Sequence, residues 1–463
     1  ALALADILRE HWASYTRAHP SRLTGVHYRA VRRALACRTP ELGGRLYQCA
    51  TTTCRKKHYA YHSCNHRNCT QCGARDQHLW TAKQEAKLLG VPYFMVTFTI
   101  PSQLRTCCLH QPKTLYHLLL KCSATALHDI TRTKLKNQHL QLHLTSVLHT
   151  WGRQAQHHPH IHVIVPAIAL DPKNQTLHRP KNPKKFLIHY QPLAARFRSL
   201  IQSTLKTDHP DLFAKLTPDQ HRALGPKTQW NVQLQPVGSG KTALRYLARY
   251  VQRSAFSAKR ILGYNAQGKI LLKWTHSTTH KTSALKLHPH EFLRRWCLHI
   301  LPKGFPRVRH YGLAAGAAKK NRDFLRRLLG QAPEISLELP PPEPFTCPHC
   351  QGPLTFLRDI PDLAATKMTH SHTMDHLPLH PAMAKERAPK NSAQRVKIGQ
   401  LQHTSYFTPG KALSTPRQSR ANSCAVRPVA PAEQKQSRQL LKTARNRLRE
   451  SPELKTQRAL GQA

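Results

Sequence analysis

The sequence predicts an α+β fold, with a sheet that carries helices on one face. The central region shows the order strand, helix, strand, strand, which is typical of this class. Six of the 13 cysteines fall between Cys37 and Cys72, which indicates a separate module held together by metal. With 463 residues, the chain is long enough for two or three folded units joined by linkers.

The charge balance indicates a polyanionic partner. Lysine and arginine number 72 against 22 acidic residues, a formal net charge of +50 before any of the 33 histidines is counted. Such an excess is typical of proteins that bind nucleic acids. The apolar runs are far shorter than the roughly 20 residues that cross a membrane, and the first residues lack the basic start of a secretory signal. We therefore expect a cytoplasmic protein without a membrane partner.

The amino-terminal part is expected to form two helices and then a metal-binding module. Apolar side chains recur at helical spacing over residues 1–35, and His19-Pro20 interrupts the pattern. Residues 37–80 are rich in cysteine and aromatic residues but too poor in aliphatic ones for a core of their own. A metal would have to hold this segment together. We place the helical segment at 1–36 and the zinc-binding domain at 37–85.

The middle of the chain carries the predicted sheet. Residues 91–100 (VPYFMVTFTI) are β-branched and aromatic and end before a proline, which favours a buried strand. A polar insertion is expected at 171–185. The other predicted elements are helices at 113–136 and 241–254, helical segments up to about 215, and strands at 141–148, 161–166 and 230–234. This central domain would span 86–330.

The composition changes after Pro333. A proline-rich stretch (PEISLELPPPEP) is followed by Cys347-Pro-His-Cys350, so we expect a linker with half a zinc site over 331–380. The half site could be completed by His370 and His372, by a second copy of the chain, or not at all. Residues 381–463 are basic and poor in aliphatic clusters, which predicts a disordered tail.

The cysteine spacing predicts structural zinc. Cys49-x4-Cys54 is followed by Cys64-x4-Cys69-x2-Cys72. Short cysteine knuckles at such a separation match the ligands of a four-coordinate zinc site, where thiolate suits the metal. The preferred ligands are Cys49, Cys54, Cys69 and Cys72, with Cys64 as a fifth candidate. Cys37 and His66 could complete a second site.

A second constellation is the histidine-rich strand QHHPHIHVIV. On a strand, alternate residues share a face, so His160 and His162 would point the same way. Two neutral imidazoles that converge on one point suit a divalent metal. The alternative is chance clustering in a chain with 33 histidines.

A third constellation lies on a predicted helix, LRYLARYV. Residues four apart share a helix face, which makes Tyr246 and Tyr250 neighbours. Two phenols near a phosphate could act as nucleophiles that form a covalent intermediate. Alternatively, both tyrosines only pack the helix. The accompanying arginines could contact DNA phosphates or be solvated charges: Arg245, Arg249 and Arg253.

The nearby GSGKT sequence does not predict nucleotide binding. The phosphate-loop motif requires a glycine five residues before Gly240, and this position holds Gln235. A metal beside paired tyrosines needs no ATP. It would polarise a phosphodiester while a phenol attacks, leaving a phosphotyrosine and a free 3′ hydroxyl.

Seven motifs occur in the order shown by one family: ACRTPELGGRLYQC, YHSCNHRNCTQCG, PYFMVTFTIP, VLHTWG, HPHIHVIVP, LRYLARYVQR and LHILPKGFPRVRHYG. Over about residues 34–330 the chain resembles the two-tyrosine HUH transposases of rolling-circle bacterial insertion sequences. The resemblance implies a zinc-binding domain and then a nuclease domain on an RRM-like antiparallel sheet. It also implies a nucleoid-associated protein that acts on single-stranded DNA at the ends of a transposable element.

The resemblance further implies roles for single residues. His160 and His162 would bind catalytic Mg²⁺ or Mn²⁺, and Tyr246 and Tyr250 would be the nucleophiles of DNA transposition and recombination. Relatives have a third metal ligand. The candidates for it here are His158, Gln233 and Gln235.

The chain also departs from the family pattern. Cys49 and Cys54 are further apart than the usual pair, and Pro166 to Leu170 replace the usual glycines after the histidine strand. Two alternatives stay open: a plasmid replication initiator or relaxase with the same chemistry, or a catalytically inactive, zinc-bearing DNA-binding protein. The resemblance does not indicate the oligomeric state.

Overall fold

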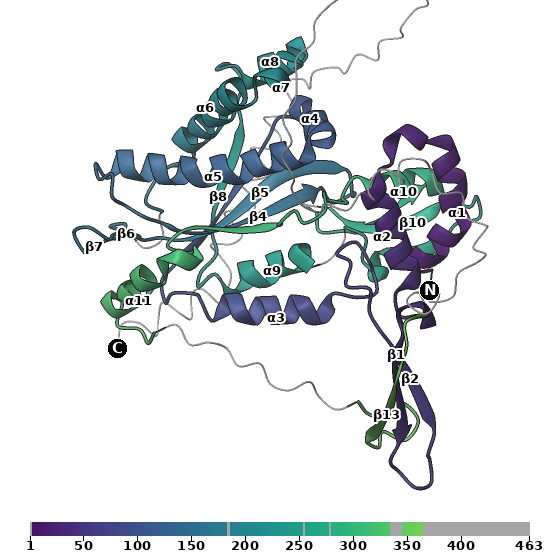
Figure 1. The fold of residues 1–463 in the computed structure, drawn as a ribbon. Coiled ribbons are helices and arrows are strands. Elements are labelled where there is room, and N and C mark those ends of the chain that lie inside the picture. Colours follow the sequence, from purple (N-terminus) through teal and green to yellow (C-terminus); the bar gives the residue numbers. More distant parts are fainter. Residues whose placement is uncertain (1, 183–185, 253–254, 277–278, 334–344, 364–463) are drawn as a thin grey trace, which may run out of the picture. The chain divides into compact units, whose positions relative to one another are not determined.

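The structure is a computed structural model that describes residues 2–182, 186–252, 255–276, 279–333 and 345–363 (Figure 1). The side chains of Arg249, Tyr250 and Gln252 are outside this description. The predicted tail at 381–463 and the candidates His370 and His372 also lie outside the described residues.

A five-stranded antiparallel sheet forms the centre of the described chain, in the order β12-β4-β5-β3-β8. The predicted α+β class is thereby confirmed, with the antiparallel sheet that the resemblance implied. The expected strands at 91–100, 141–148, 161–166 and 230–234 are all present. Their bounds, with that of the fifth strand, are β3 (Tyr93–Thr99), β4 (His143–Trp151), β5 (His157–Pro166), β8 (Asn231–Pro236) and β12 (Val308–Gly312).

Helices cover both faces of this sheet, so the prediction of one covered face is wrong (Figure 1). One face packs on α5 (Pro112–Lys134) and α6 (Tyr190–Asp208), with Phe98, Ile161 and Phe197 in the core. The other packs on α9 (Lys241–Gln252) and also contacts residues next to α3 (Ala74–Glu85). The physical reason is visible in β4, in which every residue is buried, so neither face can be left to solvent.

Gly240 lets α9 begin close to the sheet. Its φ of +79° lies in the left-handed region, and a Cβ at this position would lie 2.9 Å from the ring of Tyr93 on β3. The GSGKT sequence therefore has a structural explanation at the start of a helix, which agrees with the rejection of a phosphate loop.

The amino-terminal helices share a core with a segment more than 200 residues later. Helices α1 (Leu4–Ala18) and α2 (Gly25–Ala36) are present as predicted. Buried side chains such as Ile7, Ile270 and Trp296 belong to one apolar cluster. The later segment forms a three-stranded sheet and a helix that the sequence analysis did not predict: β9 (Ile261–Tyr264), β10 (Ile270–Thr275), β11 (Thr282–Leu287) and α10 (Pro289–Cys297).

A separate antiparallel sheet, which we call the ribbon, consists of β1 (Gly44–Cys49), β2 (Lys57–Tyr61) and β13 (Leu354–Ile360) in the order β13-β1-β2. β13 lies in the segment predicted as a linker. It pairs with β1 over its whole length, from Gly44 opposite Ile360 to Cys49 opposite Leu354. The boundaries of the five predicted segments stay a prediction.

The remaining helices and strands are short. The polar insertion contains a hairpin, and Asp171 accepts hydrogen bonds from Asn137 and Asn174 there. Within the described ranges, no helix has the length and apolar character needed to span a bilayer. The bounds are α4 (Arg105–His110), β6 (Ala169–Asp171), β7 (Thr176–His178), α7 (Pro210–Ala214), α8 (Pro218–Leu224) and α11 (Lys319–Leu328).

Candidate active site and metal centres

Three buried histidines converge on the face of the central sheet that packs against α9. His160 and His162 point the same way from β5, as predicted from strand alternation, and His149 lies directly opposite His160 on β4. Nδ1 of His149 is 2.8 Å from Nε2 of His160, which is 3.1 Å from Nε2 of His162. The ring nitrogens of all three lie within 4.8 Å of one another, a spacing that could hold a metal ion.

Neighbouring oxygen atoms orient two of these rings. Nδ1 of His160 lies 2.7 Å from the carbonyl oxygen of His158, and Nδ1 of His162 lies 3.0 Å from the hydroxyl of Thr97 on β3. A carbonyl oxygen only accepts, so Nδ1 of His160 donates and its Nε2 keeps a lone pair in the neutral ring. This is the outer hydrogen bonding usual for metal-binding histidines.

Of the three predicted candidates for the third ligand, His158 is not a member of the imidazole group, and the two glutamines lie on β8. His158 contributes its backbone carbonyl, and its side chain is not part of the imidazole group. Gln233 lies on β8 opposite Thr97, and Thr97 lies opposite His162. The backbones of Gln233 and His162 are therefore two strand spacings apart, about 9.6 Å. Gln235 is opposite Met95, further along the same strand.

His149 is the residue that the sequence analysis missed. It lies in the motif VLHTWG, and the strand at 141–148 was expected to end just before it. Register between two strands depends on their pairing, which no single strand pattern reveals. His149 could have been identified only by aligning the two predicted strands so that His149 and His160 were opposite each other.

Burial keeps these imidazoles neutral. It lowers the pKa of His162 to about 4, and the pKa values of His149 and His160 lie well below the ordinary value, first through burial and then through each ring's neighbouring histidines. Neutral imidazole is the form that binds metal. The donor set therefore fits a divalent cation.

Tyr246 lies beside the imidazole group. Its ring centroid is 6.4 Å from that of His162, the two rings are nearly perpendicular, and 39% of the residue is exposed. A phenol at this position is accessible to a substrate. Tyr250 lies one turn later on α9, on the same helix face by its position, but its side chain is outside the description.

The three arginines predicted to bind DNA have different settings. Nε of Arg245 lies 2.6 Å from a carboxylate oxygen of Glu85 on α3, so this guanidinium ties α9 to α3. The side chain of Arg249 and all of Arg253 lie outside the described residues.

Arg105, at the start of α4, is a cation near the site that the sequence analysis did not single out. Its positive charge is one of the factors that lower the pKa values of His157, His158 and His160, in each case after burial. Within the described part of the chain, its buried Nε has no hydrogen-bond partner. A guanidinium whose charge reaches these histidines makes the surroundings of the site favourable to an anion.

Four cysteines form a first sulfur group: Cys37, Cys64, Cys69 and Cys72. All four are buried, and Sγ of Cys64 lies 3.6 Å from Sγ of Cys72. The backbone N–H groups of His66 and Gln71 donate to the sulfurs of Cys64 and Cys69, as expected for charged thiolates. The side chain of His66 is not a member, because its Nδ1 accepts from the backbone of Asn68 instead.

The predicted set of four preferred ligands is divided in the structure. Cys69 and Cys72 lie in the first group, whereas Cys49 and Cys54 lie beside Cys347 and Cys350. The prediction combined neighbours in sequence, but Cys49 is at the end of β1 in the ribbon and Cys69 is in a loop outside it. The fifth candidate, Cys64, is a member of the first group.

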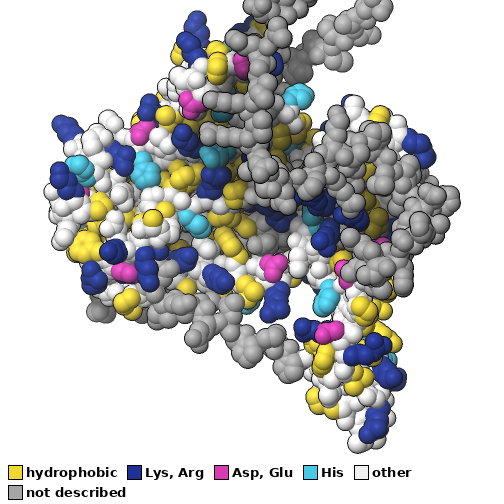
Figure 2. Space-filling view, in the orientation of Figure 1, with side chains coloured by type: hydrophobic (Ala, Val, Ile, Leu, Met, Phe, Trp, Pro, Cys, Tyr) yellow, Lys and Arg dark blue, Asp and Glu magenta, His cyan; other side chains and the backbone are white. Residues whose placement is uncertain are grey.

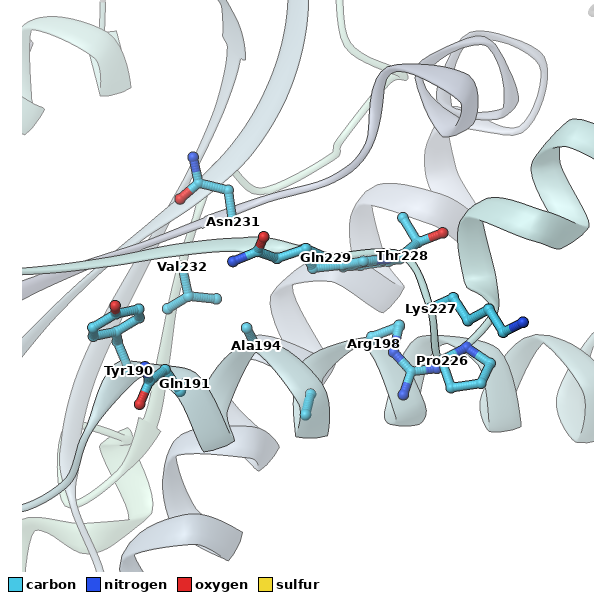
Figure 3. A pocket seen from close by; sticks show the side chains of 12 residues that line it. Tyr190, Gln191, Ala194, Arg198, Pro226, Lys227, Thr228, Gln229, Asn231 and Val232 are labelled. Atoms are coloured by element: carbon cyan, nitrogen blue, oxygen red, sulfur yellow. The ribbon is translucent and has the colours of Figure 1, made fainter. Parts of the chain in front are cut away.

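A groove of about 630 Å³ lies apart from these centres, between the start of α6 and residues 226–232 (Figure 3). Arg198 on its wall donates to the carbonyl of Leu224. The predicted catalytic and metal-binding residues are not among those that line it. The candidate active site is therefore the imidazole group with Tyr246.

Comparisons with known proteins identify two transposase domains in the chain. Residues 144–322 match a family model described as "Putative transposase", and residues 7–100 match one described as "Transposase zinc-binding domain". The first range contains the three imidazoles and both tyrosines, and the second contains the first sulfur group. Cys347 and Cys350 lie outside both.

Two bacterial proteins are similar over most of their length. "Putative transposase y4qJ" of Sinorhizobium fredii is 28% identical over 358 residues, which cover 74% of this chain and 88% of that protein. "Transposase for insertion sequence element IS801" of Pseudomonas savastanoi pv. phaseolicola is 25% identical over 304 residues, 63% of this chain and 71% of that protein.

A solved structure, the origin-recognition/nickase domain of human bocavirus non-structural protein 1, is 13% identical and covers 46% of this chain and 98% of its own. Its TM-score of 0.21 is too low to show a common fold. The matches to the two transposase domains and to the two bacterial proteins show that the chain combines a transposase zinc-binding domain with a transposase domain, which fits the two-tyrosine HUH transposases of rolling-circle bacterial insertion sequences.

Proposed function

We propose that this transposase nicks and rejoins single-stranded DNA at the ends of its insertion sequence through 5′-phosphotyrosine intermediates. The observation that carries the proposal is the position of Tyr246, whose exposed ring is 6.4 Å from that of His162 in the imidazole group. A nucleophile beside a metal-type site is the arrangement that phosphodiester cleavage requires.

His149, His160 and His162 would hold the divalent cation, Mg²⁺ or Mn²⁺. Their convergent nitrogens and the lone pair on Nε2 of His160 fit such an ion. When bound, the cation would polarise the scissile phosphate and stabilise the charge that develops on it. An all-imidazole donor set favours Mn²⁺ over Mg²⁺, because Mg²⁺ prefers oxygen ligands.

The phenol of Tyr246 or Tyr250 would supply the nucleophile. Its oxygen forms a bond to phosphorus as the bond from phosphorus to the 3′ oxygen breaks. The phenol loses a proton, and the departing 3′ oxygen gains one to become the 3′ hydroxyl. The energy of the phosphodiester is kept in the phosphotyrosine, so rejoining needs no nucleotide. Two tyrosines one turn apart would let one enzyme hold two cleaved ends.

Positive charge would hold the DNA. The chain has a formal net charge of +50, and lysine and arginine side chains are distributed over the visible face of the described residues (Figure 2). Arg105, whose positive charge acts on His158, would add to this attraction for phosphate groups. Arg245 would instead position α9 through Glu85.

The test is incubation with labelled single-stranded DNA from the element's ends and Mn²⁺ or Mg²⁺, followed by denaturing gels. We expect a protein-linked label that is lost in the Tyr246→Phe, Tyr250→Phe double variant, while each single variant loses one of the two cleavage events. Tyr190→Phe is the matched control, because this exposed tyrosine lies on α6, on the opposite face of the sheet.

Two outcomes would contradict the proposal. An adduct that persists in the double variant would exclude these tyrosines as nucleophiles. Tight DNA binding without an adduct, for any end and either metal, would favour a catalytically inactive DNA-binding protein.

A further inference from the structure

We infer that the chain holds a second structural zinc ion, bound by Cys49 and Cys54 from the amino-terminal part and by Cys347 and Cys350 from almost 300 residues later. The four sulfurs lie within 4.8 Å of one another, at the end of the ribbon where β1 meets β13. This site is separate from the first sulfur group, whose four ligands are other residues.

The distances fit tetrahedral zinc. Sγ of Cys49 is 3.4 Å from Sγ of Cys350, and Sγ of Cys54 is 3.8 Å from Sγ of Cys347. With a Zn–S bond of about 2.3 Å, two ligands of a tetrahedral site lie about 3.8 Å apart. All four cysteines are free thiols rather than disulfides.

The backbone presents each pair as a zinc knuckle. The N–H of Cys54 donates to Thr51, and the N–H of Gln351 donates to the carbonyl of Cys347. The two turns also lie against each other, because the N–H of Ala50 donates to the carbonyl of Pro353 at 2.9 Å. The pairs are thus pre-positioned for one ion.

Polar groups around the sulfurs can balance the charge of bound thiolates. Nε2 of His58, on β2, lies 3.3 Å from Sγ of Cys347, and the hydroxyl of Thr51 lies 3.7 Å from Sγ of Cys350. Lys56 adds a positive charge, with Nζ 3.4 Å from the ring of His349 between the two later cysteines. Hydrogen bonds and cations near the ligands stabilise a four-thiolate site.

The ion would join two distant parts of the chain. The ribbon has little apolar core, since most of β13 is exposed, including Phe356 at 49%. Backbone pairing with β1 alone is a weak attachment for a strand of seven residues. Zinc would therefore fix β13 to β1, and it would close a loop that contains the whole central sheet.

The experiment uses the full-length chain and two readouts. Elemental analysis should give one zinc ion per chain less for the Cys347→Ser, Cys350→Ser double variant than for the unmodified chain. After replacement by Co²⁺, the thiolate-to-cobalt absorption should fall by about half in that variant. This absorption requires sulfur ligands, so metal at the imidazole group does not contribute.

Matched variants distinguish loss of this site from other effects. Cys107→Ser and Cys297→Ser change buried cysteines outside both groups and should keep the full zinc content. Cys54→Ser with Cys49→Ser should lose the same single ion as the later pair.

Circular dichroism identifies cysteine variants that disturb folding. Cys350→Ser alone changes an exposed residue and is therefore the variant expected to disturb folding least. Unchanged zinc content and cobalt absorption in the Cys347, Cys350 double variant would overturn the inference. So would iron in place of zinc at this site.

Discussion

Nδ1 of His160 lies 2.7 Å from the carbonyl oxygen of His158, and this contact fixes which nitrogen of His160 carries the proton. Because a carbonyl oxygen accepts only, Nε2 of His160 is left with a lone pair that faces His149 and His162. His158 thus contributes its backbone carbonyl to the group, and the third imidazole, that of His149, comes from β4.

The first prediction distinguishes the roles of His149 and His158 in DNA nicking. His149→Ala should lower the rate of DNA nicking by more than about 100-fold, because it removes a ligand rather than an outer hydrogen bond. His158→Ala keeps the carbonyl and should nick DNA within about threefold of the unmodified rate. Rates are measured with labelled single strands at saturating metal, and binding is measured separately.

His139→Ala is the control for the first prediction, because His139 is exposed and outside the imidazole group. Strong loss of nicking in His158→Ala, with little loss in His149→Ala, would show that the third ligand is His158 instead.

The second prediction concerns the hydroxyl of Thr97. Thr97→Val removes the group that lies 3.0 Å from Nδ1 of His162 and orients this ring. We expect the concentration of Mn²⁺ for half-maximal nicking to rise by about 10- to 100-fold, with much of the rate recovered at high metal. Thr99→Val, one pair along the same face of β3, is the control. An unchanged metal requirement in Thr97→Val would argue against the proposed metal site.

A third prediction tests whether Arg245 binds DNA or positions α9. In the structure it pairs with Glu85, so Arg245→Ala and Glu85→Ala should lower nicking to a similar extent, and the double variant should be no worse than either. A DNA contact would give a different pattern. In that case only Arg245→Ala would weaken binding, and it would reduce the salt dependence of the affinity.

The fourth prediction is that acid destabilises the fold. Burial, with Arg322 and His310 as smaller factors, lowers the pKa of His143 to about 3. Unfolded histidine titrates near 6.5, so below this pH the unfolded chain binds a proton that the folded chain does not. The stabilising effect of the neutral ring is complete above about pH 6.5 and is lost progressively down to about pH 3.

Urea unfolding between pH 7.5 and 5 measures this effect. Each such histidine should add about 1.4 kcal/mol per pH unit to the slope of the free energy of unfolding inside this window. His143→Gln should lower the slope by about this amount, and His139→Gln, at an exposed position, should leave it unchanged. Equal slopes for His143→Gln and the unmodified chain would contradict the prediction.

Several features could be predicted from the sequence because they depend on local order. The strand at 91–100 and the helix at 241–254 follow from residue type and periodicity, as does the shared direction of His160 and His162. The density of cysteines indicated metal, and the matching family is that of a zinc-binding transposase domain. Each of these conclusions needs only residues that are close in the chain.

Tertiary structure decided the partners. Strand pairing placed His149 opposite His160, and pairing of β13 with β1 brought Cys347 and Cys350 to Cys49 and Cys54. A pattern within one strand fixes the face of a side chain but not the neighbouring strand or its register. For this reason the sequence by itself determined the fold class, the family and the types of ligand, whereas only the folded chain determined which ligands meet.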